Sequence, residues 1–157
     1  MPDGNGSLLA GRNVTPLTED QIVRVTNTFL GMDEDCPVRH EATARTVFRS
    51  GVDAGVPFAE VVFGPDIFPG QNIVDANSSL SVKGAVAHEI VHYHRHIDMR
   101  EINELELKHI DEALTSLEAA RRFPKQLSPQ DIEQLIGDAI HRLKLFVDEF
   151  RAHQVEP

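Results

Sequence analysis

Hydrophobic residues follow a helical spacing through the first third of the chain. Thr18 and Gln21 form a capping-box pattern, and the apolar residues after them recur every three or four positions, so we expect a helix over 18–31. The same spacing, opened by a proline, predicts a second helix over 35–55. Residues 1–16 are rich in glycine, asparagine and proline, and we expect them to be irregular.

A β-type pattern comes next. Residues 58–63 form a run of apolar, β-branched and aromatic residues that is bounded by proline and glycine, and residues 72–76 form a second short run. We expect the two runs to form a short antiparallel sheet that precedes the following helix.

The region after the strands has the composition of helices. Residues 82–123 contain no proline and a single glycine. One helix of that length would be unusual in a compact domain. We therefore expect a break near 98–101 and a separate helix over 102–122.

The last helix has a clear start signal. Ser128 is a capping residue and Pro129 suits the first helical position, and a broad apolar stripe follows, which predicts a helix over 128–150. The whole pattern predicts one α+β domain over residues 1–157, in which helices dominate.

Composition and charge exclude several classes of protein. Hydrophobic residues make up 41% of the 157 residues and the formal net charge is −10, so the chain can bury a core but lacks the basic surface of a general nucleic-acid binder. The single cysteine, Cys36, allows no intrachain disulfide and favours a reducing compartment. No apolar run approaches the roughly 20 residues that cross a bilayer, and the N-terminus has no signal-peptide pattern, so we expect a cytoplasmic protein with no membrane partner.

The predicted helix after position 82 contains a pattern that suits a metal ion. His88 and His92 are four residues apart, so they project from one side of the helix within about 40° of each other. Two such histidines can hold two corners of a tetrahedral zinc site. Glu89 stands beside the first histidine, where its carboxylate could take a proton from a metal-activated water.

A catalytic zinc site needs a third protein ligand, and three carboxylates are candidates. Asp98 lies six residues after the second histidine, as in an extended version of the motif. Glu106 lies near the centre of the apolar face of the next helix, with His109 three residues on. Glu112 follows His92 by twenty residues, which is enough for the chain to turn back as an antiparallel helix.

The second motif resembles a known family. His88-Glu89-x-x-His92 followed by Asp111-Glu112-Ala113-Leu114-Thr115 is similar to the gluzincin metallopeptidases of the thermolysin type, and the run from Glu112 to Ala119 is also similar to the small ImmA/IrrE-like metallopeptidases. The resemblance covers roughly residues 58–122. It departs from the family at Val91, where glycine is usual, and at Ser116, where an aspartate that orients a histidine is common.

The resemblance implies a fold, a cofactor and a reaction. It implies a minimal zincin-like domain in which Zn²⁺ is held by His88, His92 and Glu112, with Glu89 as the general base of peptide-bond hydrolysis. The substrate would be a protein or peptide that pairs with an edge strand above the metal.

Further groups have expected roles at such a site. Tyr93, His94 and His109 are candidates to stabilise the oxyanion, and the prediction names Tyr93 and His109 as catalytic. Either Asp111 or Ser116 is expected to orient a ligand histidine.

Two other functions remain open. Three Glu/Asp-x-x-His pairs, which begin at Glu89, Glu106 and Asp138, also fit a helical di-iron carboxylate protein. Alternatively, the chain is a non-catalytic metal-binding or regulatory scaffold, whose helical flanks, including the apolar stripe over 132–147, contact a protein partner.

Overall fold

The protein has an α+β fold in which helices dominate. The structure is a computed structural model that describes residues 8–71 and 76–155. In this part of the chain there are four α-helices and one three-stranded mixed sheet. The helices are α1 (Glu19–Met32), α2 (Val82–Ile97), α3 (Lys108–Arg122) and α4 (Pro129–Val155), and the strands are β1 (Val38–His40), β2 (Val47–Asp53) and β3 (Val56–Phe63).

The sheet has the strand order β1-β3-β2, so β3 is central and β2 is an outer strand. β1 is parallel to β3, whereas β2 is antiparallel to it, with Val47 opposite Val62 and Asp53 opposite Val56. The end of β3 is the buried part of the sheet: Val61, Val62 and Phe63 are almost completely inaccessible to solvent. Residues at this end therefore hold the sheet in the core.

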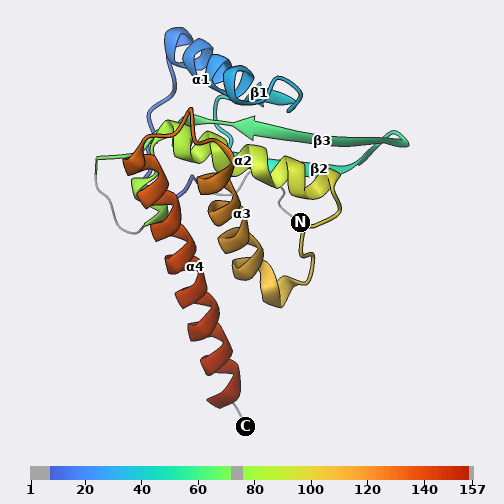
Figure 1. Cartoon of the computed structure of the whole chain (residues 1–157). Helices are drawn as coiled ribbons and strands as arrows, with labels where there is room; N and C mark the ends of the chain where they lie inside the picture. The colour runs from blue at the N-terminus through green and yellow to red at the C-terminus, as the bar shows by residue number, and fades with distance from the viewer. Residues whose placement is uncertain (1–7, 72–75, 156–157) are drawn as a thin grey trace.

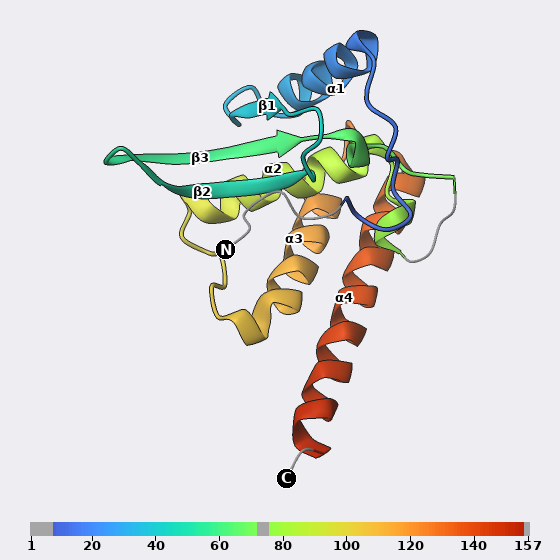
Figure 2. The ribbon, with the colours of Figure 1, turned by 180° about the vertical axis from the view of Figure 1, so that it is seen from behind.

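The helices pack around this sheet in a fixed order. α2 crosses one face of the sheet, and α1 lies beside β1 and α2 (Figure 1). α3 and α4 form an antiparallel pair that packs against α2, and the end of α4 extends beyond the rest of the molecule (Figure 2). The core cluster joins Phe29 of α1, Phe63 of β3, Ile90 of α2 and Leu135 of α4.

The first predicted helix is confirmed, but the second is wrong. The Thr18 hydroxyl accepts a hydrogen bond from the Gln21 amide, and the Gln21 side chain accepts one from the Thr18 amide, which caps α1. Residues 35–55, expected to be helical, form β1 and β2 instead. Ala54 and Gly55 adopt positive φ angles of 49° and 81° and so make the tight turn between β2 and β3.

The predicted sheet is partly wrong. The run over 58–63 is confirmed as part of β3, but most of the run over 72–76 lies outside the described residues. The described sheet is mixed rather than antiparallel, because β1 is parallel to β3 and β2 is antiparallel to it, and both partners of β3 come from earlier in the chain. Pairing with β3 overrides the helical spacing of residues 35–55, since a strand gains its hydrogen bonds from a distant segment.

The later helices agree closely with their predicted positions. α2 ends at Ile97, so the expected break over 98–101 is confirmed, and Met99 there has a φ of 53°. α3 begins at Lys108 rather than 102, because residues 105–107 form a separate 3₁₀ turn. α4 starts at Pro129, as expected, and continues to Val155. In the described ranges, no helix is both long enough and apolar enough to cross a membrane.

Gly64 allows a close backbone approach at the end of β3. A Cβ atom at this position would lie 1.7 Å from the carbonyl oxygen of Ala44, and the Gly64 amide donates a hydrogen bond to the Thr46 hydroxyl. We expect Gly64→Ala to lower the free energy of unfolding by at least about 2 kcal/mol in urea titrations, because two backbone segments must separate. Gly31→Ala is the control: no atom lies within 4 Å of its added methyl group. Equal stabilities of the two variants would contradict this prediction.

Candidate metal centre

The N-terminus of α2 is held in place by the N-terminus of α4. The Ser81 hydroxyl accepts a hydrogen bond from the Gly84 amide and donates one to Asp131 at 2.6 Å. The Ser81 amide donates to the Gln134 side chain at 3.1 Å. The helix that carries the histidines is therefore anchored at its start to α4.

Three side chains converge between α2 and α3. The Nε2 atoms of His88 and His92 lie 2.8 Å and 3.0 Å from Glu112 Oε2, and 3.0 Å from each other. Among the described residues, these three form the one group of at least three histidine, cysteine or carboxylate side chains whose ligand atoms could hold a metal ion. The structure thus brings together the two histidines and Glu112, the third ligand that the motif resemblance implies.

The other two carboxylates lie elsewhere. Asp98 caps the end of α2, where it is exposed and paired with Arg100 at 3.3 Å. Glu106 is exposed on the 3₁₀ turn before α3. The Glu106/His109 pair, which a di-iron site would use together with Glu89/His92, lies outside the convergent group.

The donor set fits a zinc ion. Two imidazole nitrogens and a carboxylate oxygen are common zinc ligands, and bond lengths near 2.0–2.1 Å place tetrahedral ligand atoms roughly 3.3 Å apart. The observed separations of 2.8–3.0 Å need only a small expansion to reach that value. In addition, Glu89 Oε2 is buried and has no hydrogen-bond partner among the described residues, so it can bind a ligand at this site.

Proximity changes the protonation of His92 and Glu112 in the metal-free protein. Burial lowers the pKa of His92, but the charge of Glu112 and its hydrogen bond raise it more, to about 9. Burial raises the pKa of Glu112, but the neighbouring His92 and His88 hold it well below its usual value. His92 and Glu112 therefore form an ion pair near neutral pH when no metal is bound.

This ion pair predicts a pH-dependent stability of the metal-free protein. The pKa of His92 is raised from 6.5 to about 9, so its contribution is complete below pH 6.5 and is lost as the pH rises through about 9. We expect the free energy of unfolding to fall by on the order of 2 kcal/mol across this range in urea titrations with a chelator present. Glu112→Gln is expected to flatten the profile, and an equal slope in both proteins would contradict the assignment.

A cavity of about 130 Å³ opens onto the three side chains. Its lining includes His88, Glu89, His92, Glu112 and Arg142, so the expected general base faces the same space as the metal-binding atoms. The Arg142 guanidinium comes from α4 and lies 3.3 Å from Asp138 and 3.9 Å from Glu112. Burial lowers the pKa of Arg142, but these carboxylates raise it more, so the cavity contains a permanent cation.

Arg142 was not among the site residues expected from the sequence. A signal was present, because Asp138 and Arg142 are charged residues four apart that interrupt the apolar stripe of the last helix. Charges inside such a stripe indicate a buried pair or a site. Whether these two charged residues belong to a site depends on which helix packs against them.

The side chains expected to stabilise an oxyanion have other partners. Tyr93 packs against Phe48 with ring centroids 6.4 Å apart, and His94 bonds to Asp33. His109 bonds to Glu149 of α4 at 2.9 Å. Neither Tyr93 nor His109 is among the residues that line the cavity, so their catalytic roles stay predictions.

Asp111 and Ser116 are the two candidates to orient a ligand histidine, and Ser116 is the one that contacts such a histidine. Its hydroxyl lies 2.8 Å from His88 Nδ1. Asp111 instead accepts hydrogen bonds from Arg95 and from the Ile102 amide, and so ties the loop after α2 to α3.

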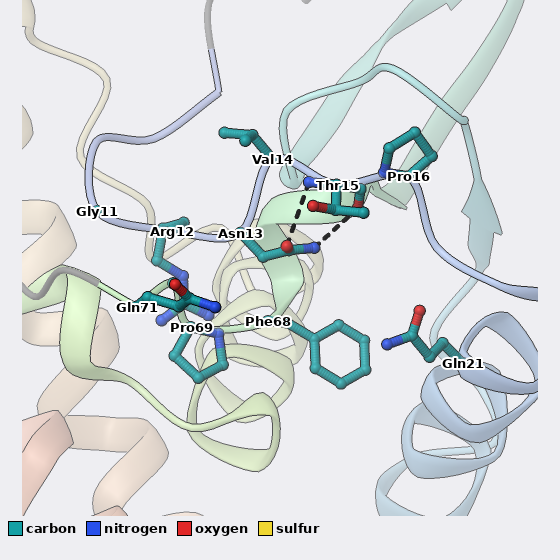
Figure 3. Close-up of a pocket in the computed structure, with 11 residues that line it drawn as sticks. Gly11, Arg12, Asn13, Val14, Thr15, Pro16, Gln21, Phe68, Pro69 and Gln71 are labelled. Carbon is teal, nitrogen blue, oxygen red and sulfur yellow. Dashed lines mark hydrogen bonds between the residues drawn. The ribbon is translucent and has the colours of Figure 1, made fainter.

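A larger pocket, of about 700 Å³, lies outside the metal centre. It is formed by the segments 11–16 and 68–71 with Gln21, and Figure 3 shows the Asn13 side chain bonded to the backbone of Thr15 beside it. The described residues that line it include no histidine, cysteine or carboxylate side chain. A large volume by itself indicates no ligand or reaction, so the smaller cavity is the candidate site.

Comparisons with known proteins identify no relative. No protein-family model matches the chain, and neither a curated protein nor a solved structure matches it. The case for a function therefore depends on the geometry of the site and on the motif resemblance.

Proposed function

We propose that this protein is a zinc-dependent peptide hydrolase of the gluzincin type. The observation that carries the proposal is the convergence of His88, His92 and Glu112 at one cavity, together with the unpartnered, buried oxygen of Glu89. A structural zinc site would have four protein ligands, whereas three ligands and a free carboxylate suit a catalytic one.

Each group has a defined task in this proposal. His88, His92 and Glu112 would hold the zinc ion, which when bound activates water and polarises a carbonyl group. Glu89 accepts the proton of the attacking water and passes it to the leaving amine. In the part of the chain that the structure describes, its Oε2 atom has no hydrogen-bond partner that would compete with the water.

Of the three arginines that line the cavity, Arg142 is the one with a described ion-pair contact to a proposed metal ligand, and we assign it the task of stabilising negative charge on the substrate. It lines the cavity and lies 3.9 Å from the ligand oxygen of Glu112. A guanidinium group donates to a developing oxyanion without any change in its own protonation. We assign it the role that the sequence analysis gave to Tyr93 and His109.

The outer strand supports a peptide substrate. In the described sheet β2 is an edge strand that pairs with β3 alone, and Phe48 of this strand stacks on His92 with ring centroids 6.4 Å apart. Val47 and Phe48 also line the cavity. An extended peptide that adds to this edge would pass beside the metal ligands.

Metal content and peptide cleavage test the proposal together. We expect about one zinc per chain by elemental mass spectrometry and cleavage of a mixed peptide library by the zinc-loaded protein that a chelator stops. A protein that binds no zinc, or that binds zinc and cleaves no peptide in the library, would contradict it.

One observation favours the alternative of a non-catalytic scaffold. Five large apolar side chains of α4 are exposed and follow one another at intervals of four and three residues, as in a helix–helix interface. They are Ile136, Ile140, Leu143, Val147 and Phe150. A scaffold would keep its function in a Glu89→Gln variant, whereas a hydrolase would lose it.

A further inference from the structure

The second ring nitrogen of His88 begins a chain of buried hydrogen bonds. His88 Nδ1 lies 2.8 Å from the hydroxyl of Ser116, one helical turn after Glu112 on α3. The Ser116 hydroxyl in turn donates to Asp138 Oδ2 at 2.6 Å. Ser116 and Asp138 are both completely inaccessible to solvent, so no water competes for these bonds.

The direction of these bonds determines which nitrogen of His88 carries a proton. Arg142 donates to the other oxygen of Asp138, at 3.3 Å, so both oxygens of this carboxylate accept hydrogen bonds. The Ser116 proton therefore points to Asp138, and its oxygen is left to accept the Nδ1 proton of His88. The Nε2 atom, which faces Glu112 and His92, then has a free lone pair for a metal ion.

We propose that Asp138 is a positioning residue of the metal centre, which acts on His88 through the Ser116 hydroxyl. A ligand histidine commonly donates its second N–H to a carboxylate, which orients the ring and raises its basicity. In this chain the side chain that contacts His88 Nδ1 is the uncharged Ser116. The negative charge is therefore supplied by Asp138 of α4. The proposal rests on the zinc site of the proposed function, and not on peptide hydrolysis.

Zinc affinity in a double-mutant cycle tests this inference. We expect Ser116→Ala and Asp138→Asn each to lower the affinity for zinc by about 10- to 100-fold in competition with a fluorescent chelator. The double variant should bind zinc no more weakly than the weaker single variant, because the two residues act in series.

The chain offers a matched control for each substitution. Thr115→Val removes a neighbouring buried hydroxyl, which bonds to the Asp111 carbonyl. Asp131→Asn removes the charge of another α4 carboxylate, which accepts a hydrogen bond from the Ser81 hydroxyl. We expect both controls to keep zinc affinity within about twofold of the wild type, since neither residue contacts a ligand histidine.

A nuclear magnetic resonance measurement on the zinc-loaded wild-type protein needs no variant. We expect the Hδ1 proton of His88 to give a downfield signal that exchanges slowly with water, because it is buried and hydrogen-bonded. Absence of this signal would overturn the proposal.

The outcomes of the cycle are distinct. Unchanged affinity in Ser116→Ala, or losses that add up in the double variant, would overturn the connection of Asp138 to His88 through Ser116. Wild-type protein that binds zinc and shows the expected losses, but cleaves no peptide, would refute the proposed hydrolysis and leave this inference standing.

Discussion

Replacement of Glu89 by glutamine is expected to lower kcat/KM for peptide cleavage by about 10²–10⁴-fold, the usual contribution of a general base. Glutamine has nearly the same shape but cannot accept the proton of the attacking water. The histidine and glutamate ligands are unchanged, so the variant should still bind one zinc per chain. Glu89 is well suited to the role because its Oε2 atom is buried in the cavity without a hydrogen-bond partner.

The measurement pairs initial rates on a cleaved peptide with zinc content. Glu106→Gln is the matched control, since this exposed glutamate lies on the turn before α3 and we expect full activity. Full activity of Glu89→Gln would remove it as the base. Loss of zinc together with activity would instead make Glu89 part of the metal-binding group.

Replacement of Glu112 by glutamine is expected to have the largest effect on the metal. Structural sites with four ligands bind zinc with a free energy of about 10–16 kcal/mol. Loss of one anionic ligand should therefore weaken zinc binding by roughly 10²–10³-fold. In the structure Glu112 contacts both histidines through one oxygen, at 2.8 Å and 3.0 Å, so no nearby group can replace it without movement.

Chelator competition on Glu112→Gln and Glu106→Gln separates two of the three candidate ligands. We expect zinc affinity to be lost in the first variant and kept in the second, because Glu106 is exposed and outside the convergent group. The opposite result would transfer the third ligand to Glu106 and require a different packing of α3.

Features that depend on neighbouring residues were predictable from sequence. The capping box at Thr18, the start of α4 at Pro129 and the end of α2 near Asp98 all lie close to their expected positions. The same holds for His88 and His92, because four residues of helix place two side chains on one side whatever the rest of the fold does.

The strands before β3 could not be predicted in the same way. Residues 35–55 have apolar positions at a helical spacing, but β1 and β2 gain their hydrogen bonds from β3. Such pairing is decided by a distant segment, so local spacing gave the wrong element.

The sequence by itself determined the pair of histidines, the neighbouring Glu89 and the set of carboxylates from which a third ligand could come. Only the tertiary structure decided that Glu112, and neither Glu106 nor Asp98, meets the two histidines. The same packing added Arg142 and Asp138 from α4, residues about fifty positions away in the chain. The physical reason is that helical geometry is set within a single turn, whereas convergence of side chains from three helices depends on how those helices pack.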